Sequence, residues 1–336
     1  MLMRTQESSE NRSPLGIVHR RKAEPIVIDG RDNILSVTLL AEGRHVVSGG
    51  RERKIRRWRI QDGMEVGRPM DAGSPVLNIA VSQDGKWIVS GTESGFVTVW
   101  NAESHSKVAE LKAHLDFVRA VDISPDATKI ATGSDDNSAC VWSLSTGKRQ
   151  LGPLRHSNWV VAAKFSPDGR LIVTATWNRD SVRVYDGQNG NLLFESPVKV
   201  NSVFNHSLAW ASDSKQFFAL SHDGCIYRVD MSTGTILSKW RTHSTKNPTC
   251  ISLASNGTFL AASGDSSVSL WDTTTQEQIG SAIEYPHNVW SMAMSSNYDL
   301  VTSGDKRIIL RALCGTLPPH YLNNVSVLAL EKNWRS

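Results

Sequence analysis

The side chains that could carry out catalysis are scattered along the 336 residues and do not gather in a motif. The ten histidines lie apart, and the four cysteines are dozens of residues from one another (Cys140, Cys225, Cys250 and Cys314). Such spacing gives neither a Cys-x-x-Cys metal pair nor a disulfide framework, and it predicts reduced, buried thiols. The sequence also lacks a Gly-x-x-x-x-Gly-Lys-Ser/Thr phosphate loop, a Gly-x-Ser-x-Gly nucleophile elbow and a His-Glu-x-x-His metal motif. We therefore expect no enzyme activity, no metal site and no cofactor.

His114 and Asp136 have the residue types of a general base and of a carboxylate that orients it. Aspartates recur at corresponding places later in the chain, as Asp223, Asp265 and Asp305. An active site needs such a pair once, whereas a repeated fold needs its structural residues in every unit. The recurrence therefore predicts a scaffolding role for these aspartates.

A basic stretch, Arg51-Glu52-Arg53-Lys54-Ile55-Arg56-Arg57-Trp58-Arg59, is the sharpest charge feature of the sequence. It could bind an acidic peptide, a phosphate or a nucleic acid. Alternatively, residues 51–54 form an exposed turn, and Arg57 and Arg59 alternate with buried Ile55 and Trp58 on a solvated strand face. We favour the solvated strand because the net charge of +4 leaves little positive excess elsewhere.

The elements that must position these residues follow a repeat of about 42 residues. Trp58, Trp100 and Trp142 are each 42 residues apart, and each ends a short apolar run of the kind that forms a strand. The same register continues in more degenerate copies to give seven units, which end near Tyr185, Val229, Trp271 and Arg311. Turns rich in Ser, Asn, Asp and Gly recur ahead of the closing runs, at residues 82–85, 124–127, 166–169 and 255–257. Four strands in each unit predict an all-β fold, a β-propeller of seven blades.

The sequence from about residue 24 to residue 313 resembles the WD-repeat family. In the third unit His114, Thr132, Asp136 and Trp142 occupy the four positions of the family pattern. The resemblance implies a structural role in which His and Asp are tied together and the hydroxyl accepts from the indole N–H. Trp58 and Trp100 keep a serine in the hydroxyl position, Ser48 and Ser90, whereas Trp271 lacks an obvious one. More loosely, the chain is similar to WD-repeat proteins of mushroom-forming fungi, from which no chemistry carries over.

A propeller must protect the edges of its sheets, and the family closes its ring with a strand from the other end of the chain. We expect residues 25–28 to complete the seventh blade. The predicted organisation is a flexible tail at residues 1–22, the propeller at 23–314 and a C-terminal extension at 315–336. The charged first 22 residues do not resemble a signal peptide, and no stretch has the apolar length of a membrane span. These features predict a protein of the cytoplasm, the nucleus or both.

The resemblance also places certain residues on the top rim, the end of the ring at which the first strand of each blade begins. Aromatic residues fill four of these positions (Phe117, Trp159, Phe204 and Trp290), and Arg119, His206 and Asn288 fill others. Neighbouring turns add Glu93, Asp135 and Arg179 as a polar margin. Aromatic residues and arginine are typical of interface hot spots, although any one ring could instead pack between blades.

The sequence therefore predicts a non-catalytic scaffold whose top rim binds peptide segments of partner proteins. Two alternatives stay open. An enzyme could use the central channel as its active site, which would require carboxylates or histidines that converge there with perturbed pKa values. A nucleic-acid or phosphate platform could use residues 51–59.

Overall fold

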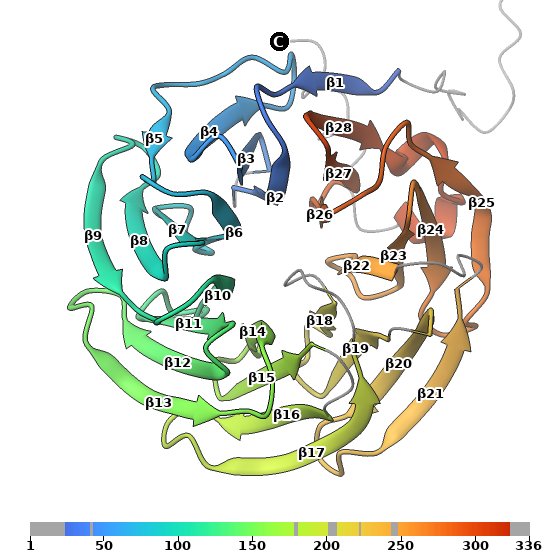
Figure 1. Ribbon diagram of the computed structural model, residues 1–336. Coiled ribbons are helices and arrows are strands. Elements are labelled where there is room, and N and C mark those ends of the chain that lie inside the picture. The colour runs from blue at the N-terminus through green and yellow to red at the C-terminus, as the bar shows by residue number, and fades with distance from the viewer. Residues whose placement is uncertain are drawn as a thin grey trace, which may run out of the picture.

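The computed structural model describes residues 24–40, 43–177, 181–200, 207–221, 223–242 and 248–322. These residues form seven antiparallel sheets of four strands each, arranged as blades around a central opening (Figure 1). The chain is therefore an all-β propeller with the seven blades that the tryptophan repeat predicts.

Within each blade, the first strand lines the central opening and the next two lie progressively farther out. The innermost strands are β2 (Ile34–Leu39), β6 (Val76–Val81), β10 (Val118–Ile123), β14 (Val160–Phe165), β18 (Leu208–Trp210), β22 (Pro248–Leu253) and β26 (Ser291–Met294). The second strands are β3 (His45–Gly50), β7 (Trp87–Thr92), β11 (Lys129–Ser134), β15 (Leu171–Thr176), β19 (Gln216–Leu220), β23 (Phe259–Gly264) and β27 (Asp299–Gly304). The third strands are β4 (Lys54–Arg59), β8 (Phe96–Asn101), β12 (Ser138–Ser143), β16 (Ser181–Asp186), β20 (Cys225–Asp230), β24 (Ser267–Asp272) and β28 (Arg307–Ala312).

The outermost strands are amphipathic, because one face packs on the blade and the other meets solvent. They are β5 (Met70–Asp71), β9 (Lys107–Lys112), β13 (Arg149–Arg155), β17 (Leu192–Lys199), β21 (Ile236–Arg241), β25 (Gln278–Glu284) and, in the seventh blade, β1 (Ile26–Asp29). Two short 3-10 helices, η1 (Leu313–Gly315) and η2 (Pro319–Leu322), follow β28. No helix in the described ranges is long and apolar enough to cross a membrane.

The seventh blade combines strands from the two ends of the propeller sequence. β1 pairs antiparallel with β28, so that Ile26 lies opposite Leu310 and Asp29 lies opposite Arg307. The Arg307 Nε donates to the Asp29 carboxylate at 3.0 Å. The N-terminal strand therefore supplies the outer edge of a blade whose other three strands come from residues 291–312.

Neighbouring blades are joined around the channel by hydrogen bonds from backbone to side chain. At four junctions in the described part of the chain, a polar side chain on one inner strand accepts from a backbone N–H of the next. The acceptors and donors are Ser36 Oγ and Ile79 N (3.1 Å), Asn78 Oδ1 and Val121 N (3.0 Å), Asp122 Oδ2 and Phe165 N (2.8 Å), and Ser291 Oγ and Val37 N (3.0 Å). These bonds hold the inner strands at one height, so that equivalent residues of successive blades face one another.

Candidate interaction site on the propeller rim

The third blade contains the network that the family resemblance implies. His114 Nδ1 lies 2.9 Å from an Asp136 carboxylate oxygen, and His114 Nε2 lies 2.7 Å from the Thr132 hydroxyl. The Trp142 indole N–H donates to the same hydroxyl at 3.0 Å. Although burial opposes it, hydrogen bonding by His114 and Ser138 holds the pKa of Asp136 well below its usual range. The His114 side chain is only 1% exposed, so this pair is closed to a substrate.

The other periodic tryptophans also lie in the cores of their blades. The indole N–H of Trp58 donates to Ser48 Oγ at 2.7 Å, and that of Trp100 donates to Ser90 Oγ at 3.0 Å. Trp271 is 3% exposed and packs in a cluster between the fifth and sixth blades. These tryptophans are consequently unable to offer an indole face to a partner.

A different set of aromatic residues gathers on the top rim of the third and fourth blades. The guanidinium of Arg119 lies over two rings, with its carbon 5.2 Å from the centre of Phe117 and 5.6 Å from the centre of Trp159. Trp159 in turn stacks on Trp177, with ring centres 4.9 Å apart and planes 14° from parallel. We call these four side chains, Phe117, Arg119, Trp159 and Trp177, the rim ladder.

Asp135 fixes the centre of the rim ladder. Its carboxylate accepts from Arg119 Nε at 2.9 Å and from Arg119 Nη2 at 2.7 Å, a two-point contact that holds the guanidinium in one plane. Asp135 itself is 8% exposed, because it lies beneath the arginine. Arg119 is thus both neutralised and oriented within the protein itself.

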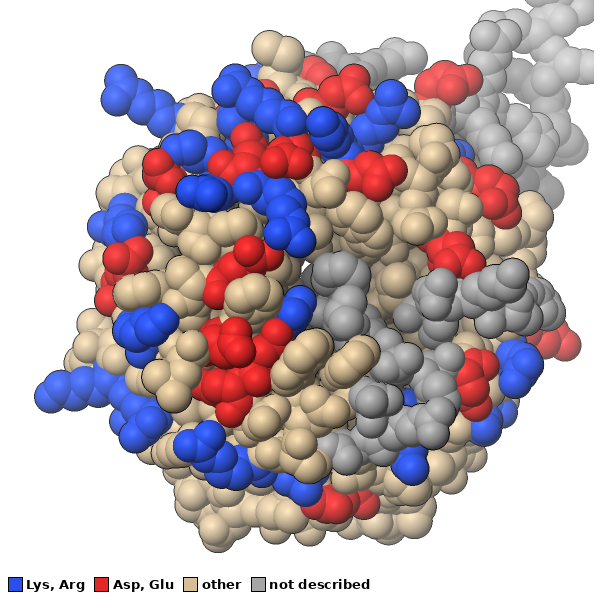
Figure 2. All heavy atoms as spheres, in the orientation of Figure 1, with Lys and Arg blue, Asp and Glu red and all other residues tan. Residues whose placement is uncertain are grey.

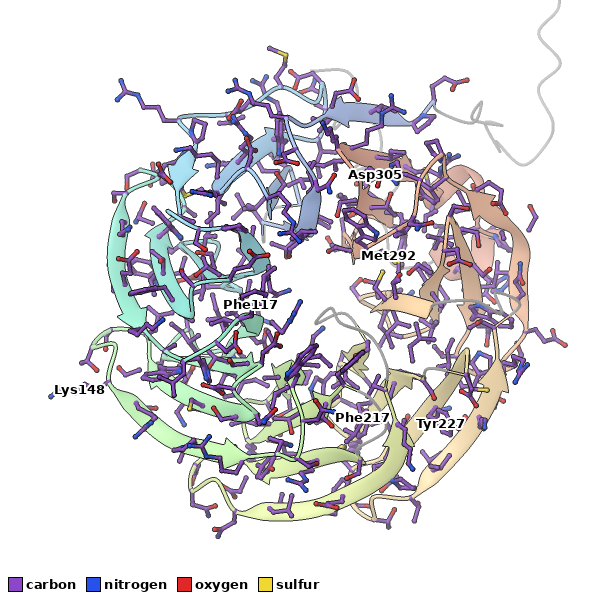
Figure 3. The ribbon with its side chains drawn as sticks, viewed as in Figure 1. Phe117, Lys148, Phe217, Tyr227, Met292 and Asp305 are labelled. Carbon is purple, nitrogen blue, oxygen red and sulfur yellow. The ribbon has the colours of Figure 1, made fainter. Side chains whose placement is uncertain are left out.

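The rim ladder is at the surface. Phe117, Trp159 and Trp177 are half-buried, and Leu115, in the loop that leads to Phe117, is 90% exposed. Figure 3 shows Phe117 at the edge of the central opening, whereas Lys148 lies at the outer circumference. The ladder therefore presents aromatic and aliphatic surface next to the mouth of the channel.

A family model described as "WD domain, G-beta repeat" matches residues 70–101, 105–143, 149–186 and 234–272. Each matched segment contains the outer strand of one blade and the first three strands of the next. The chain is a seven-bladed WD-repeat β-propeller. No curated protein matches its sequence. WD-repeat propellers commonly serve as scaffolds for protein interactions and are typically non-catalytic.

Trp177 was not predicted as a site residue of this WD-repeat propeller. It lies 42 residues after Asp135, in the equivalent turn of the next blade, so the period could have found it. Glu93 lies 42 residues before Asp135, and its carboxylate accepts from Arg51 Nη1 at 2.9 Å. One turn position thus contributes to the rim in four successive blades.

The remaining predicted rim residues do not join the ladder. Asn288 is exposed and Trp290 is half-buried, and both directly precede β26 of the seventh blade, across the opening from β14 (Figure 1). Phe204, His206 and Arg179 lie outside the described residues. The structure therefore brings together Phe117, Arg119, Asp135 and Trp159 from the predicted set.

The prediction that Asp265 and Asp305 take the place of Asp136 is wrong. Three residues separate β11 from β12, but only two separate β23 from β24 and β27 from β28. In these shorter turns Asp265 (φ 48°) and Asp305 (φ 47°) adopt the left-handed conformation that Asn137 (φ 63°) adopts in the third blade. Asp223 does correspond to Asp136, because it accepts from the N–H two residues later, as Asp136 does.

The basic stretch at residues 51–59 is largely neutralised within the first blade. Arg56 is buried, and its guanidinium contacts Glu52 at 2.7 and 2.9 Å and Glu65 at 2.5 Å. Hydrogen bonding to Glu52 is the main reason that the pKa of Arg56 rises above its usual value. The other carboxylate pairs are Arg51–Glu93 (2.9 Å), Lys54–Asp71 (2.5 Å) and Arg59–Asp62 (3.1 Å). Figure 2 accordingly shows basic and acidic groups intermixed over β4 and β5, which disfavours a polyanion platform.

The alternative hypothesis, an enzyme with its active site in the central channel, requires several titratable groups that converge there. The lining of the channel cavity includes one carboxylate, Asp122, and one lysine, Lys164, among residues that are otherwise uncharged. Within the ranges that the structure describes, His, Cys, Asp and Glu side chains form no group of three or more that could hold a metal ion. An acid–base pair is therefore the most that the described channel offers.

Proposed function

We propose that this WD-repeat propeller is a non-catalytic scaffold that binds peptide segments of partner proteins at the rim ladder. The observation that supports this most directly is the ladder itself, an arginine held between two aromatic rings and extended by a second tryptophan. Aromatic residues and arginine are the side chains that dominate the energy of protein interfaces.

The ladder is pre-organised for binding. Arg119 is already held by Asp135 and by ring stacking, so little side-chain freedom remains to be lost when a partner docks. The half-buried rings leave part of each face to contact an apolar side chain, and exposed Leu115 extends that apolar area. Asp116, exposed between Leu115 and Phe117, supplies a polar margin.

The test is a comparison of partner proteins recovered with the wild-type chain and with the double variant Trp159→Ala/Trp177→Ala. Quantitative mass spectrometry after affinity purification from the native cell should show at least a tenfold loss of the direct partners. Trp87→Ala is the matched control, because Trp87 is a half-buried tryptophan at the start of β7, the end of the blade opposite the rim. Unchanged recovery with the folded double variant would refute the ladder as the binding site.

We also propose that the scaffold acts in the cytoplasm or the nucleus. Cys140, Cys225 and Cys250 are buried free thiols, and Cys314 is a half-buried one. Free thiols of this kind are usual in reducing compartments, whereas secreted domains commonly pair theirs.

A further inference from the structure

One position on each inner strand contributes to a ring of side chains inside the channel. The ring members are Thr38, Ala80, Asp122, Lys164, Ala209, Ser252 and Ala293, and all of them line a cavity of about 390 Å³. The first four are each 42 residues apart, which places them at the same height in successive blades. These four residues lie in the later halves of their strands, whereas the rim ladder lies at the end of the blades where the inner strands begin.

The cavity exists because five of the seven ring members are small. Alanine, serine and threonine side chains leave the centre of the channel open. The two long or charged members, Asp122 and Lys164, come from adjacent blades and so stand side by side.

Both charged groups are held in place by the next blade. Asp122 Oδ2 accepts from the backbone N–H of Phe165 at 2.8 Å, and Lys164 Nζ donates to the carbonyl oxygen of Leu208 at 2.9 Å. The ammonium of Lys164 has three N–H donors, and this bond engages one of them. Among the described residues, Lys164 Nζ makes this hydrogen bond and no ion pair with a carboxylate, so two of its N–H donors remain for a ligand in the cavity.

The buried surroundings disfavour the charged forms of both Asp122 and Lys164. Burial raises the pKa of Asp122 to about 6, even though Lys164 and two backbone N–H groups favour its ionised form. Burial likewise lowers the pKa of Lys164 despite the attraction of Asp122. A ligand that brings an opposite charge to each group would relieve both penalties.

We propose that this cavity binds a small zwitterion with an apolar side chain, of the α-amino acid class. The ligand carboxylate pairs with Lys164 and its ammonium pairs with Asp122. These two ligand charges are neighbours, as the two protein charges are. Its side chain lies against the apolar part of the lining, which includes Leu39, Val81, Trp210, Leu253 and Met294.

The balance of charge explains why a zwitterion fits better than an ion. A ligand with only a carboxylate would be attracted by Lys164 but repelled by the negative charge of Asp122. A ligand with only an amine would be attracted by Asp122 but repelled by Lys164. The cavity volume is near the lower end of the range for small-molecule pockets, which suits a molecule of amino-acid size.

Isothermal titration calorimetry of the full chain tests the ligand class. The probe is L-leucine, and its matched comparators are 4-methylpentanoate, which lacks the amino group, and 3-methylbutylamine, which lacks the carboxylate. We expect L-leucine to bind at least tenfold more tightly than either comparator. Absence of leucine binding, or equal affinity for a comparator, would overturn the proposal.

Two variants test the residues. Lys164→Met keeps the length of the side chain and removes its charge, and Asp122→Asn keeps an oxygen to accept from the Phe165 N–H. Each should weaken L-leucine binding at least tenfold. Lys148→Met, at the exposed circumference, should leave the affinity unchanged. Leucine binding that persists unchanged in Asp122→Asn and in folded Lys164→Met would show that the cavity is not the site. Neither variant should change the recovery of partner proteins that bind the rim ladder.

Discussion

At the scale of single residues, the hydroxyl of Thr132 connects two buried rings, those of His114 and Trp142. One oxygen contacts the Nε2 of His114, accepts from the indole of Trp142 and lies 3.3 Å from the carbonyl oxygen of Cys140. The residue is fully buried, so water cannot replace it. Two ring systems in the core of the third blade therefore depend on one hydroxyl group.

Replacement of this hydroxyl by a methyl group should lower the free energy of unfolding strongly, although the volume of the side chain hardly changes. Thr132→Val has almost the same shape but leaves the polar atoms of His114 and Trp142 buried without a partner. We expect a loss of about 2–4 kcal/mol in the free energy of unfolding, measured by equilibrium unfolding in urea. Thr132→Ser keeps the hydroxyl and should lose only about 1 kcal/mol, from one buried methyl group. Equal losses in the two variants would mean that the network contributes nothing beyond packing.

The sequence reveals such networks better than it reveals the rim. His114, Thr132, Asp136 and Trp142 follow a spacing that the repeat imposes, so their positions are predictable. The stack of Trp159 on Trp177 joins the paired ends of β14 and β15 within one blade, and its geometry depends on side-chain rotamers, which no local pattern encodes. Trp177 also lies in a turn without a motif, and only the period relates it to Asp135.

At the scale of elements, the turn between the first two strands of each blade fixes the register of the hairpin. One residue of each turn takes a left-handed conformation, and its φ lies between 54° and 73° at Gly43, Gly85, Ala127, Gly169, Ser214, Gly257 and Tyr298. Glycine adopts this conformation without strain, whereas a side chain with Cβ does not. The third blade therefore has a strained turn at Ala127.

Exchange of alanine and glycine at two of these turns should have opposite effects. Ala127→Gly should raise the free energy of unfolding by about 0.5–1 kcal/mol, because it relieves the left-handed strain. Gly257→Ala should lower it by about 1 kcal/mol, and since a Cβ there would meet no atom within 4 Å, the loss reports on the backbone alone. Thermal and urea unfolding of both variants would measure the difference. Changes of the same sign would contradict this explanation.

Strand positions in the degenerate blades were predictable even where the tryptophan is missing. Tyr185 lies opposite Ile172, as Trp142 lies opposite Ile130, because alternation of buried residues sets the register without the indole. Turn lengths were not predictable. An aspartate fits both the three-residue turn of the third blade and the left-handed position of a two-residue turn, so Asp265 was assigned to the wrong one.

At the scale of the whole molecule, closure of the ring depends on a strand of four residues. Ile28 of β1 is 5% exposed and packs in a cluster that includes residues of the seventh and first blades, among them Ile34, Trp58, Val301 and Ile308. The cluster spans the junction at which the two ends of the propeller meet. Its packing therefore stabilises the contact between blades as well as the seventh blade.

Truncation of the Ile28 side chain should lower the stability of the whole propeller. Ile28→Ala should lower the free energy of unfolding by about 2–4 kcal/mol, because it leaves a cavity in this cluster. Val27→Ala is the matched control on the same strand, since Val27 is 49% exposed, and it should cost less than about 1 kcal/mol. Both values come from urea unfolding. If the two variants unfold alike, β1 does not anchor the ring through its buried face.

The pairing of β1 with β28 also sets an order of events during synthesis. Asp29 and Arg307 are 278 positions apart, so β1 leaves the ribosome long before its partner strand exists. Six blades can assemble while their own four strands emerge, because each of those sheets is continuous in the chain. The seventh cannot, and until residues 307–312 are made its inner strands have no outer edge to pair with. The ring therefore cannot close before β28 has emerged, and this open intermediate is the stage at which a chaperone or a protease would find the protein most accessible.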